Sequence, residues 1–235
     1  ELMDINKHNE KIWDEYLKAY GLSFVSKSDR DIMTMILFAI NGVEDKKVLD
    51  LGVGTGRTTE ILLPKSKEYI GTDYSPKGIE ICKSRFPDGE FIVNDFTEGL
   101  PFDDNSYDFV FLSFNGIDYC VKEKREFVIN EMFRVSTKWI CYSTHDLNMI
   151  LDDRIWNTNY IGLEKEEDRI ELVKENDWSL LEHKKEKGLI TYFEKYDYTI
   201  NYLNEKYNPS ELRVVPNLNW EKSAHWGFNY FLIEK

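Results

Sequence analysis

Residues 46–57 read KKVLDLGVGTGR, an apolar run followed by three alternating glycines. The apolar run is typical of a buried strand, and the polar residues after the last glycine predict the start of a helix. Gly52, Gly54 and Gly56 allow positive φ angles and a close approach of a ligand to the backbone. The amide groups of the helix start, from Thr55 onward, lack partners within the helix. We therefore expect this strand, turn and helix to cradle a nucleotide.

The spacing of the glycines indicates which nucleotide is bound. The dinucleotide fingerprint G-x-G-x-x-G needs a small residue at position 57, but this chain has Arg57 there and Gly56 one place earlier. Asp50, two residues before the first glycine, would repel a pyrophosphate but suits a ligand that carries an ammonium and a sulfonium. Asp73 ends the segment YIGTD, where an acid accepts hydrogen bonds from ribose hydroxyls. S-adenosylmethionine is a ligand with all these groups.

Composition excludes several classes of partner. The formal net charge of −13 opposes binding to the negatively charged backbone of nucleic acid, and no run of Lys and Arg supplies a local basic face. The longest apolar stretch, residues 35–40, is too short to cross a bilayer, and the N-terminus has no signal pattern. We therefore expect a cytoplasmic protein without a nucleic-acid or membrane partner, whose oligomeric state the sequence leaves open.

The cysteines favour a reduced interior. Cys82, Cys120 and Cys141 are odd in number and widely separated, with no C-x-x-C pair. This pattern is typical of buried thiols rather than of disulfides or a zinc site. We expect no structural metal.

Strand and helix patterns alternate along the first two thirds of the chain. Two helices come first, at residues 1–20 and from an N-cap at Ser28 to a stop at 41–42. The apolar runs predict strands at about 46–51, 68–72, 91–93, 107–114 and 139–143, separated by helices. This order predicts an α/β fold: a doubly wound, Rossmann-like, mostly parallel sheet with helices on both faces.

The rhythm changes after residue 151. Residues 152–187 are charged and include a predicted helix at 164–176. A strand or hairpin arm at 189–198, a short helix at 199–207, and strands at 212–215 and 226–233 follow. We expect one domain made of N-terminal helices (1–42), a cofactor-binding core (43–150), a lid inserted over the acceptor (151–198) and C-terminal strands (199–235).

Four motifs together resemble the class I S-adenosylmethionine-dependent methyltransferases. They are VLDLGVGTG, YIGTDYS, the strand end VNDF, and SYDFVFLSFNGIDY with the helix that ends EMFRV. They come in the family's order over about residues 46–150. The chain departs from the family before the fifth strand, where residues 135–139 lack the common Lys-Pro-Gly-Gly turn. The resemblance implies a seven-stranded sheet whose last strand, 226–233, is antiparallel.

The resemblance and the strand ends together predict the cofactor site. The glycines would lie along the methionyl part, Asp73 would hold the ribose, Asp95 would accept from the adenine amino group, and Phe96 would stack beside the ring. The alternative for Asp95 is a loop acid that caps its own turn. The full set of expected cofactor-binding residues is Asp50, Gly52, Gly54, Thr55, Gly56, Asp73, Tyr74, Asn94, Asp95, Phe96 and Ser113.

The acceptor is expected at the same edge of the sheet. A hydroxyl acceptor would benefit from a general base, and His145 is the best-placed histidine because it follows the fifth predicted strand. The alternative is a hydrogen-bonded histidine at the sheet edge. The expected acceptor contacts are Tyr16, Tyr20, Asn115, Asp118, Tyr119, Tyr192 and Tyr196.

Three functions remain open. The favoured one is methyl transfer to a small polar metabolite, a sugar or an amine, on oxygen or nitrogen. A protein or RNA methyltransferase would need an open acceptor surface. A non-catalytic sensor or a nicotinamide enzyme on the same fold is opposed by Asp50 and Arg57.

Overall fold

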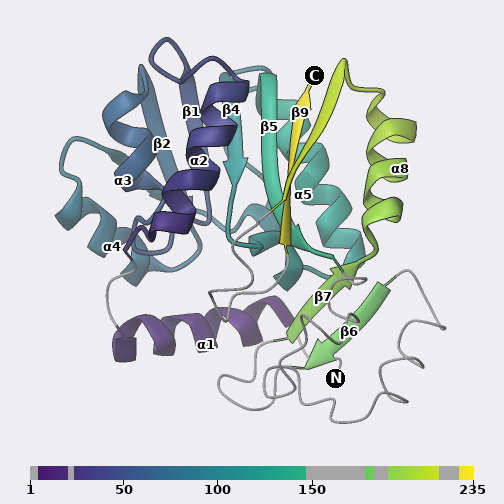
Figure 1. The fold of residues 1–235 in the computed structure, drawn as a ribbon. Coiled ribbons are helices and arrows are strands. Elements are labelled where there is room, and N and C mark those ends of the chain that lie inside the picture. The colour runs from purple at the N-terminus through teal and green to yellow at the C-terminus, as the bar shows by residue number, and fades with distance from the viewer. Residues whose placement is uncertain (1–4, 21–23, 147–177, 183–189, 217–227) are drawn as a thin grey trace.

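The computed structural model describes residues 5–20, 24–146, 178–182, 190–216 and 228–235 (Figure 1). Its main sheet has seven strands in the order β3-β2-β1-β4-β5-β9-β8, and β6 and β7 form a separate pair. The strands are β1 (Lys47–Leu51), β2 (Glu68–Asp73), β3 (Glu90–Val93), β4 (Tyr107–Leu112), β5 (Ser136–His145), β6 (Trp178–Glu182), β7 (Ile190–Glu194), β8 (Glu211–Pro216) and β9 (Phe228–Glu234). The helices are α1 (Ile5–Tyr20), α2 (Lys27–Ala39), α3 (Thr59–Leu62), α4 (Pro76–Arg85), α5 (Lys122–Val135) and α8 (Tyr196–Tyr207).

Strand direction follows the expectation. β1 pairs in parallel with β2 and β4, and the parallel pairing continues to β3 on one side and β5 on the other. β9 pairs antiparallel with both β5 and β8. The doubly wound, mostly parallel sheet with an antiparallel last strand is therefore confirmed.

Successive side chains of the central strands point to opposite faces of the sheet and pack into two apolar layers. Val48 packs with α2, α3 and α4, whereas its neighbour Leu49 packs with α5 and α8. β4 divides in the same way, with Phe109 and Phe111 on the first side and Val110 on the second. Helices therefore cover both faces of the sheet (Figure 1).

Two predicted strands have different ends in the structure. β4 stops at Leu112, because Phe114 and Asn115 take left-handed φ angles of 51° and 59°. β5 instead continues to His145, which pairs with Phe228 of β9. His145 is therefore a strand residue and not part of the loop after it.

The cap of α2 is also different from the predicted one. Ser26, not Ser28, is the N-cap: its hydroxyl accepts from the Asp29 backbone N–H, and the Asp29 carboxylate accepts from the Ser26 N–H. The sequence contains two overlapping S-x-x-D patterns, Ser26 to Asp29 and Ser28 to Asp31, and both satisfy the capping rule. The earlier one was missed because the pattern does not distinguish them.

The edge where the parallel strands end carries two further elements. α1 and the β6–β7 pair both lie there (Figure 1). β7 joins the end of β5 through a bridge between Glu194 and Asp146. Of the expected lid, 151–198, the structure thus describes the pair of strands at the predicted edge, while the helix expected at 164–176 lies outside the described residues.

The three cysteines are all free and buried, as predicted. Within the described ranges, we find no helix that is both long and apolar enough to traverse a bilayer.

Candidate active site

The glycine loop forms one end of a cavity of about 170 Å³ at the carboxyl edge of the sheet. Gly52 and Gly54 have φ angles of 67° and 55° and line this cavity together with Thr55. A Cβ on Gly54 would meet no atom within 4 Å. The loop therefore offers bare backbone to a ligand, as the sequence predicts.

Gly56 serves the fold instead of the cavity. Its φ is 93°, it is not among the lining residues, and a Cβ there would collide with the Phe86 ring. Its lack of a side chain is needed for packing against α4, and the predicted contact of Gly56 with the cofactor stays a prediction.

Asp50 lies beneath the loop and is fully buried. Its Oδ2 accepts from the hydroxyls of Thr58 and Tyr69, both at 2.7 Å. Burial raises the pKa of Asp50 to about 7, against the lowering effect of these two hydrogen bonds. The carboxyl group is not part of the cavity wall and supports the loop from beneath, so the predicted contact of Asp50 with the cofactor stays a prediction.

Asp73 lies in the wall and orders the backbone around it. One oxygen accepts from Gly54 N at 2.8 Å and the other from Ser75 N at 2.9 Å. Burial raises the pKa of Asp73 to about 6, and the two backbone hydrogen bonds oppose this shift. The neighbouring Tyr74 also lines the cavity, and burial raises the pKa of its phenol. Asp73, at the end of β2, therefore lies at the carboxyl edge of the sheet, where the sequence predicts it.

The position of Asp95 is compatible with both interpretations of the sequence, a contact with adenine and a cap of its own turn. Its Oδ1 accepts from the backbone N–H and the hydroxyl of Thr97, at 2.8 and 2.7 Å, so it caps its own turn. It also lines the cavity, together with Phe96 and Thr97. Asn94 is not in the wall, because its amide donates to Gly99 O at 3.0 Å instead.

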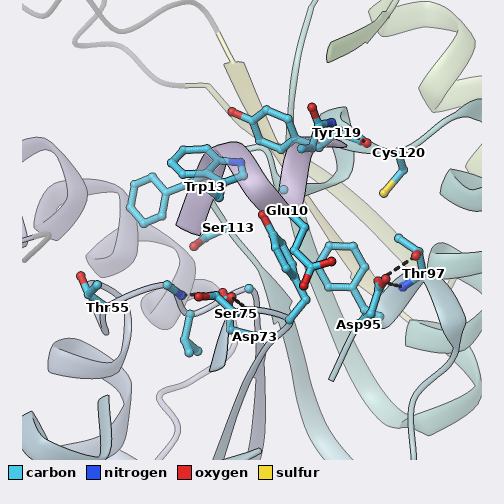
Figure 2. Close-up of a pocket in the computed structure, with 18 of the residues that line it drawn as sticks. Glu10, Trp13, Thr55, Asp73, Ser75, Asp95, Thr97, Ser113, Tyr119 and Cys120 are labelled. Atoms are coloured by element: carbon cyan, nitrogen blue, oxygen red, sulfur yellow. Dashed lines mark hydrogen bonds between the residues drawn. The ribbon is translucent and has the colours of Figure 1, made fainter. Parts of the chain in front are cut away.

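The lining residues follow one another across the cavity. Figure 2 shows Thr55 on one side, Asp95 on the other and Asp73 between them. Ser113, which is predicted at this edge of the sheet, also lies in the cavity wall. This order gives an elongated ligand a series of polar groups from end to end.

Past β4 the chain turns sharply. Phe114 lines the cavity, and the guanidinium of Arg57 lies 3.0 Å above its ring. Asn115 N donates to the Ser143 hydroxyl at 2.9 Å, which ties the turn to β5. Two successive non-glycine residues in the left-handed region are costly, and such strain is typical of functional sites.

α1 forms another wall of the cavity, and the residues that line it are not the ones that the sequence predicts. Asn9, Glu10 and Trp13 line the cavity (Figure 2). The Asn9 amide donates to Tyr119 O at 3.4 Å, and the Trp13 ring meets the Tyr119 ring edge-on at 5.6 Å. The expected residues Tyr16 and Tyr20 belong to the same helix, but their side chains lie outside the described part. The usable signal was the one-turn spacing of Asn9 and Trp13, which puts both on one helix face.

Among the lining side chains that the structure describes, Arg57 is the only cationic one, against the acids Glu10, Asp73 and Asp95. A largely acidic cavity suits a ligand with positive charge. The bare Gly54 and the acids at the ends of β2 and β3 therefore fit S-adenosylmethionine.

His145 and Asp118 meet beside the cavity without lining it. His145 Nδ1 lies 2.7 Å from Asp118 Oδ2, and its Nε2 lies 3.4 Å from Asn115 Nδ2. Asp118 is buried in the 3₁₀ helix η3 (Gly116–Tyr119) and also pairs with the buried Arg125 at 3.1 Å. Of the expected acceptor residues, only Tyr119 lies in the described wall, and the buried Asp118 acts on His145 instead.

Of the two tyrosines expected from the lid, the structure describes the side chain of Tyr196, and it does not line the cavity. Tyr196 begins α8 and packs on Phe231, with the ring centroids 6.0 Å apart. It packs on the apolar layer around α5 and α8, and its predicted contact with the acceptor stays a prediction. Tyr192 lies in β7, but its side chain is outside the described part.

Comparisons with known proteins point to one family. Residues 48–138 match the family described as methyltransferase domain. The chain is 31% identical over 153 residues to a demethylmenaquinone methyltransferase of Thermotoga maritima, covering 56% of this chain and 65% of that protein. The match therefore spans slightly less than two thirds of that relative's length.

Two solved structures share the fold over nearly their whole length. The 1,6-didemethyltoxoflavin-N1-methyltransferase of Burkholderia thailandensis, with S-adenosylhomocysteine bound, has a TM-score of 0.65 at 10% identity and covers 100% of this chain and 92% of its own. The N-methyltransferase NodS of Bradyrhizobium japonicum, also with S-adenosylhomocysteine, has a TM-score of 0.65 at 12% identity, with coverages of 97% and 98%. Residues 48–138 therefore carry a methyltransferase domain, and the chain shares the fold of these S-adenosylmethionine-dependent methyltransferases.

Proposed function

We propose that the protein transfers the methyl group of S-adenosylmethionine to a small molecule held beside the turn after β4. The observation that carries this proposal is the cavity, because it joins the glycine loop and two strand-end acids to a second wall made by α1 and η3. A cofactor laid along the first wall would present its methyl group toward the second.

Each polar group of the first wall has a role in this proposal. Asp73 would accept from the two ribose hydroxyls, since each carboxylate oxygen can accept a second hydrogen bond besides the backbone one it has. Asp95 would accept from the adenine amino group beside the Phe96 ring, and the bare backbone at Gly54 would lie along the methionyl end. Ser113 would lie near the methionyl chain.

A small acceptor is favoured over a macromolecule. α1 covers the second wall through the contacts of Asn9 and Trp13 with Tyr119, and a covered wall suits a small acceptor better than a macromolecule. The net charge of −13 and Glu10 in the wall disfavour RNA. The relatives are named for demethylmenaquinone and didemethyltoxoflavin, and both names denote small molecules. We assign the acceptor to the class of small metabolites, with the inserted segment 151–198 as a lid over it.

Methyl transfer depends mainly on the alignment of the reacting atoms. Methyl transfer is an in-line displacement at a carbon that the sulfonium already activates, so the chain's work is to hold the nucleophile, methyl and sulfur in line and to exclude water. A neutral amine needs little more. A hydroxyl needs a proton acceptor, and His145 is our candidate, with Asn115 and Tyr119 as acceptor contacts.

Transfer of a labelled methyl group tests this function. The protein is incubated with methyl-labelled S-adenosylmethionine and a bacterial extract separated into small-molecule, protein and RNA fractions. We expect label to appear in the small-molecule fraction. Label confined to protein or RNA would contradict the acceptor class, and cofactor binding without any transfer would favour a sensor.

A further inference from the structure

We propose that Asp118 is a positioning residue that keeps the proton of His145 on Nδ1 and makes Nε2 the proton acceptor of the site. The acceptor molecule that needs such a group is one whose nucleophilic atom must lose a proton, that is, a hydroxyl compound rather than an amine. The inference rests on the methyltransferase function proposed above and names its substrate class.

Asp118 is surrounded by donors. Its Oδ2 accepts from His145 N at 3.0 Å and lies 2.7 Å from His145 Nδ1. Its Oδ1 accepts from Arg125 Nη1 at 3.1 Å and from the Thr144 hydroxyl at 2.5 Å. The side chain is 1% exposed, so these protein groups and not water determine its hydrogen bonding.

The buried arginine fixes the role of this carboxylate. Arg125 is itself 1% exposed, and Asp118 and Glu194, 3.5 Å from its Nη2, are the acids that balance its charge. A carboxylate only accepts hydrogen bonds, so the ring nitrogen that faces it must be the one that carries hydrogen. The neutral ring therefore has hydrogen on Nδ1 and a lone pair on Nε2.

Nε2 points toward the turn that borders the cavity. It lies 3.4 Å from Asn115 Nδ2, a long distance for a hydrogen bond. Asn115 stands between Phe114 and Gly116, and both of these residues line the cavity. An acceptor hydroxyl that approached this turn could replace the long amide contact.

The proposed step balances in protons and electrons. The hydroxyl proton passes to Nε2 while the oxygen forms its bond to the methyl carbon. The bond between that carbon and sulfur breaks, and its electron pair leaves with S-adenosylhomocysteine. The imidazolium that forms lies against Asp118, whose negative charge stabilises it. The proton then returns to water.

The position of the ring proton can be measured without knowing the acceptor. Long-range proton–nitrogen NMR correlations on the nitrogen-15-labelled protein with S-adenosylhomocysteine, recorded at rising pH until the spectrum no longer changes, distinguish the two tautomers of the neutral ring. The His145→Gln spectrum identifies the His145 signals among those of the four histidines.

Two variants separate positioning from mere structure. In Asp118→Asn, the carbonyl oxygen should turn to Arg125 and the amide to the ring, which moves the proton to Nε2. Thr144→Val removes a donor to the same carboxylate but leaves its contact with Nδ1, so the tautomer should stay unchanged. A structural role alone would not link the tautomer to one of these variants and not the other.

The expected result is the Nδ1–H tautomer in the wild type and in Thr144→Val, and its loss in Asp118→Asn. The Nε2–H tautomer in the wild type would overturn the proposal even if Asp118→Asn failed to fold. Calorimetry of S-adenosylhomocysteine binding on the same samples distinguishes a failure of the proposed function from a failure of the positioning role of Asp118. Absence of binding would contradict the methyltransferase function, whichever tautomer is observed.

Discussion

The cavity has two walls that are held together in different ways. The cofactor wall, Gly52 to Thr55 with Asp73 and Asp95, consists of backbone and acids at or just after the ends of three neighbouring strands. The acceptor wall, residues 113–120 with α1, depends on contacts between distant segments, such as Asn9 with Tyr119 and, behind it, Asp118 with His145. The first wall needs only a strand, a glycine turn and an acid, whereas the second exists only when the whole chain is folded.

The largest effect is expected in the acceptor wall. If the acceptor is a hydroxyl compound, His145→Ala should lower turnover roughly 10²- to 10⁴-fold, as is usual when a general base is lost. Cofactor affinity should be unchanged, because His145 is not part of the cofactor wall. Single-turnover rates with the acceptor found in the labelled extract measure this.

Tyr196→Phe is the matched control for that variant. The sequence predicts both residues near the acceptor, but Tyr196 packs on Phe231. Its turnover should equal that of the wild type. Unchanged turnover of His145→Ala between about pH 6 and 9 would remove this histidine from the mechanism and leave alignment alone to explain the rate.

The next effect concerns the cofactor wall. Asp73→Ala should weaken S-adenosylmethionine binding by about 1 to 3 kcal/mol for each ribose hydroxyl left unmatched, or roughly 5- to 150-fold each. Calorimetry gives the affinity.

Asp108→Ala controls for the loss of a carboxylate that orders backbone. Asp108 accepts from Lys47 N at 2.9 Å and from the Thr137 hydroxyl at 3.0 Å, at the opposite edge of the sheet. It should cost stability without changing affinity. Equal losses of affinity in both variants would mean that Asp73 only supports the loop.

Asp50 provides a test of pH dependence. Its pKa of about 7 in the folded protein exceeds the value of about 3.9 in an unfolded chain, so the folded state binds more protons between these values. The free energy of unfolding should therefore fall as pH rises from about 4 to 7, by up to about 1.4 kcal/mol per pH unit from this group.

Asp50→Asn should remove that part of the slope. Urea unfolding at several pH values, without cofactor, compares the variant with the wild type. The difference in unfolding free energy, variant minus wild type, should grow as pH rises through this range. Parallel curves for the two proteins would show that Asp50 does not titrate there.

The smallest effects distinguish two glycines of one loop. Gly56→Ala should destabilise the protein by about 1 to 3 kcal/mol, because its Cβ would press on the Phe86 ring. Gly54→Ala would put its Cβ into the open cavity, so it should weaken cofactor binding more than Gly56→Ala does. Melting temperature and calorimetry on both variants check this, and identical profiles would contradict the division of roles.

The sequence predicts the cofactor wall well because its signals are local. Strand, glycine turn and acid are neighbours along the chain, and parallel strands bring their ends to one edge. Even here, local pattern could not tell that Gly56 faces Phe86 or that Asp50 turns beneath the loop, since the direction of a side chain depends on what packs behind it. The seven strands and the antiparallel β9 were predictable from the family resemblance.

The acceptor wall was predictable only in part. His145 and Asp118 were both expected at this edge, but their pairing joins residues that are far apart in the chain. The sequence predicts a first helix at residues 1–20 but does not distinguish Trp13 as a cavity residue. Which face of that helix meets the cavity is decided by Tyr119, and helical periodicity carries no information about that partner.

A titration of the protein with S-adenosylmethionine, S-adenosylhomocysteine and NAD tests the central claim most directly. The glycine loop, Asp73 and Asp95 predict that the first two ligands bind at one site per chain and that NAD does not. Displacement of S-adenosylmethionine by S-adenosylhomocysteine would place both ligands in the same cavity. Tight binding of NAD, with none of S-adenosylmethionine, would contradict the assignment of this cavity.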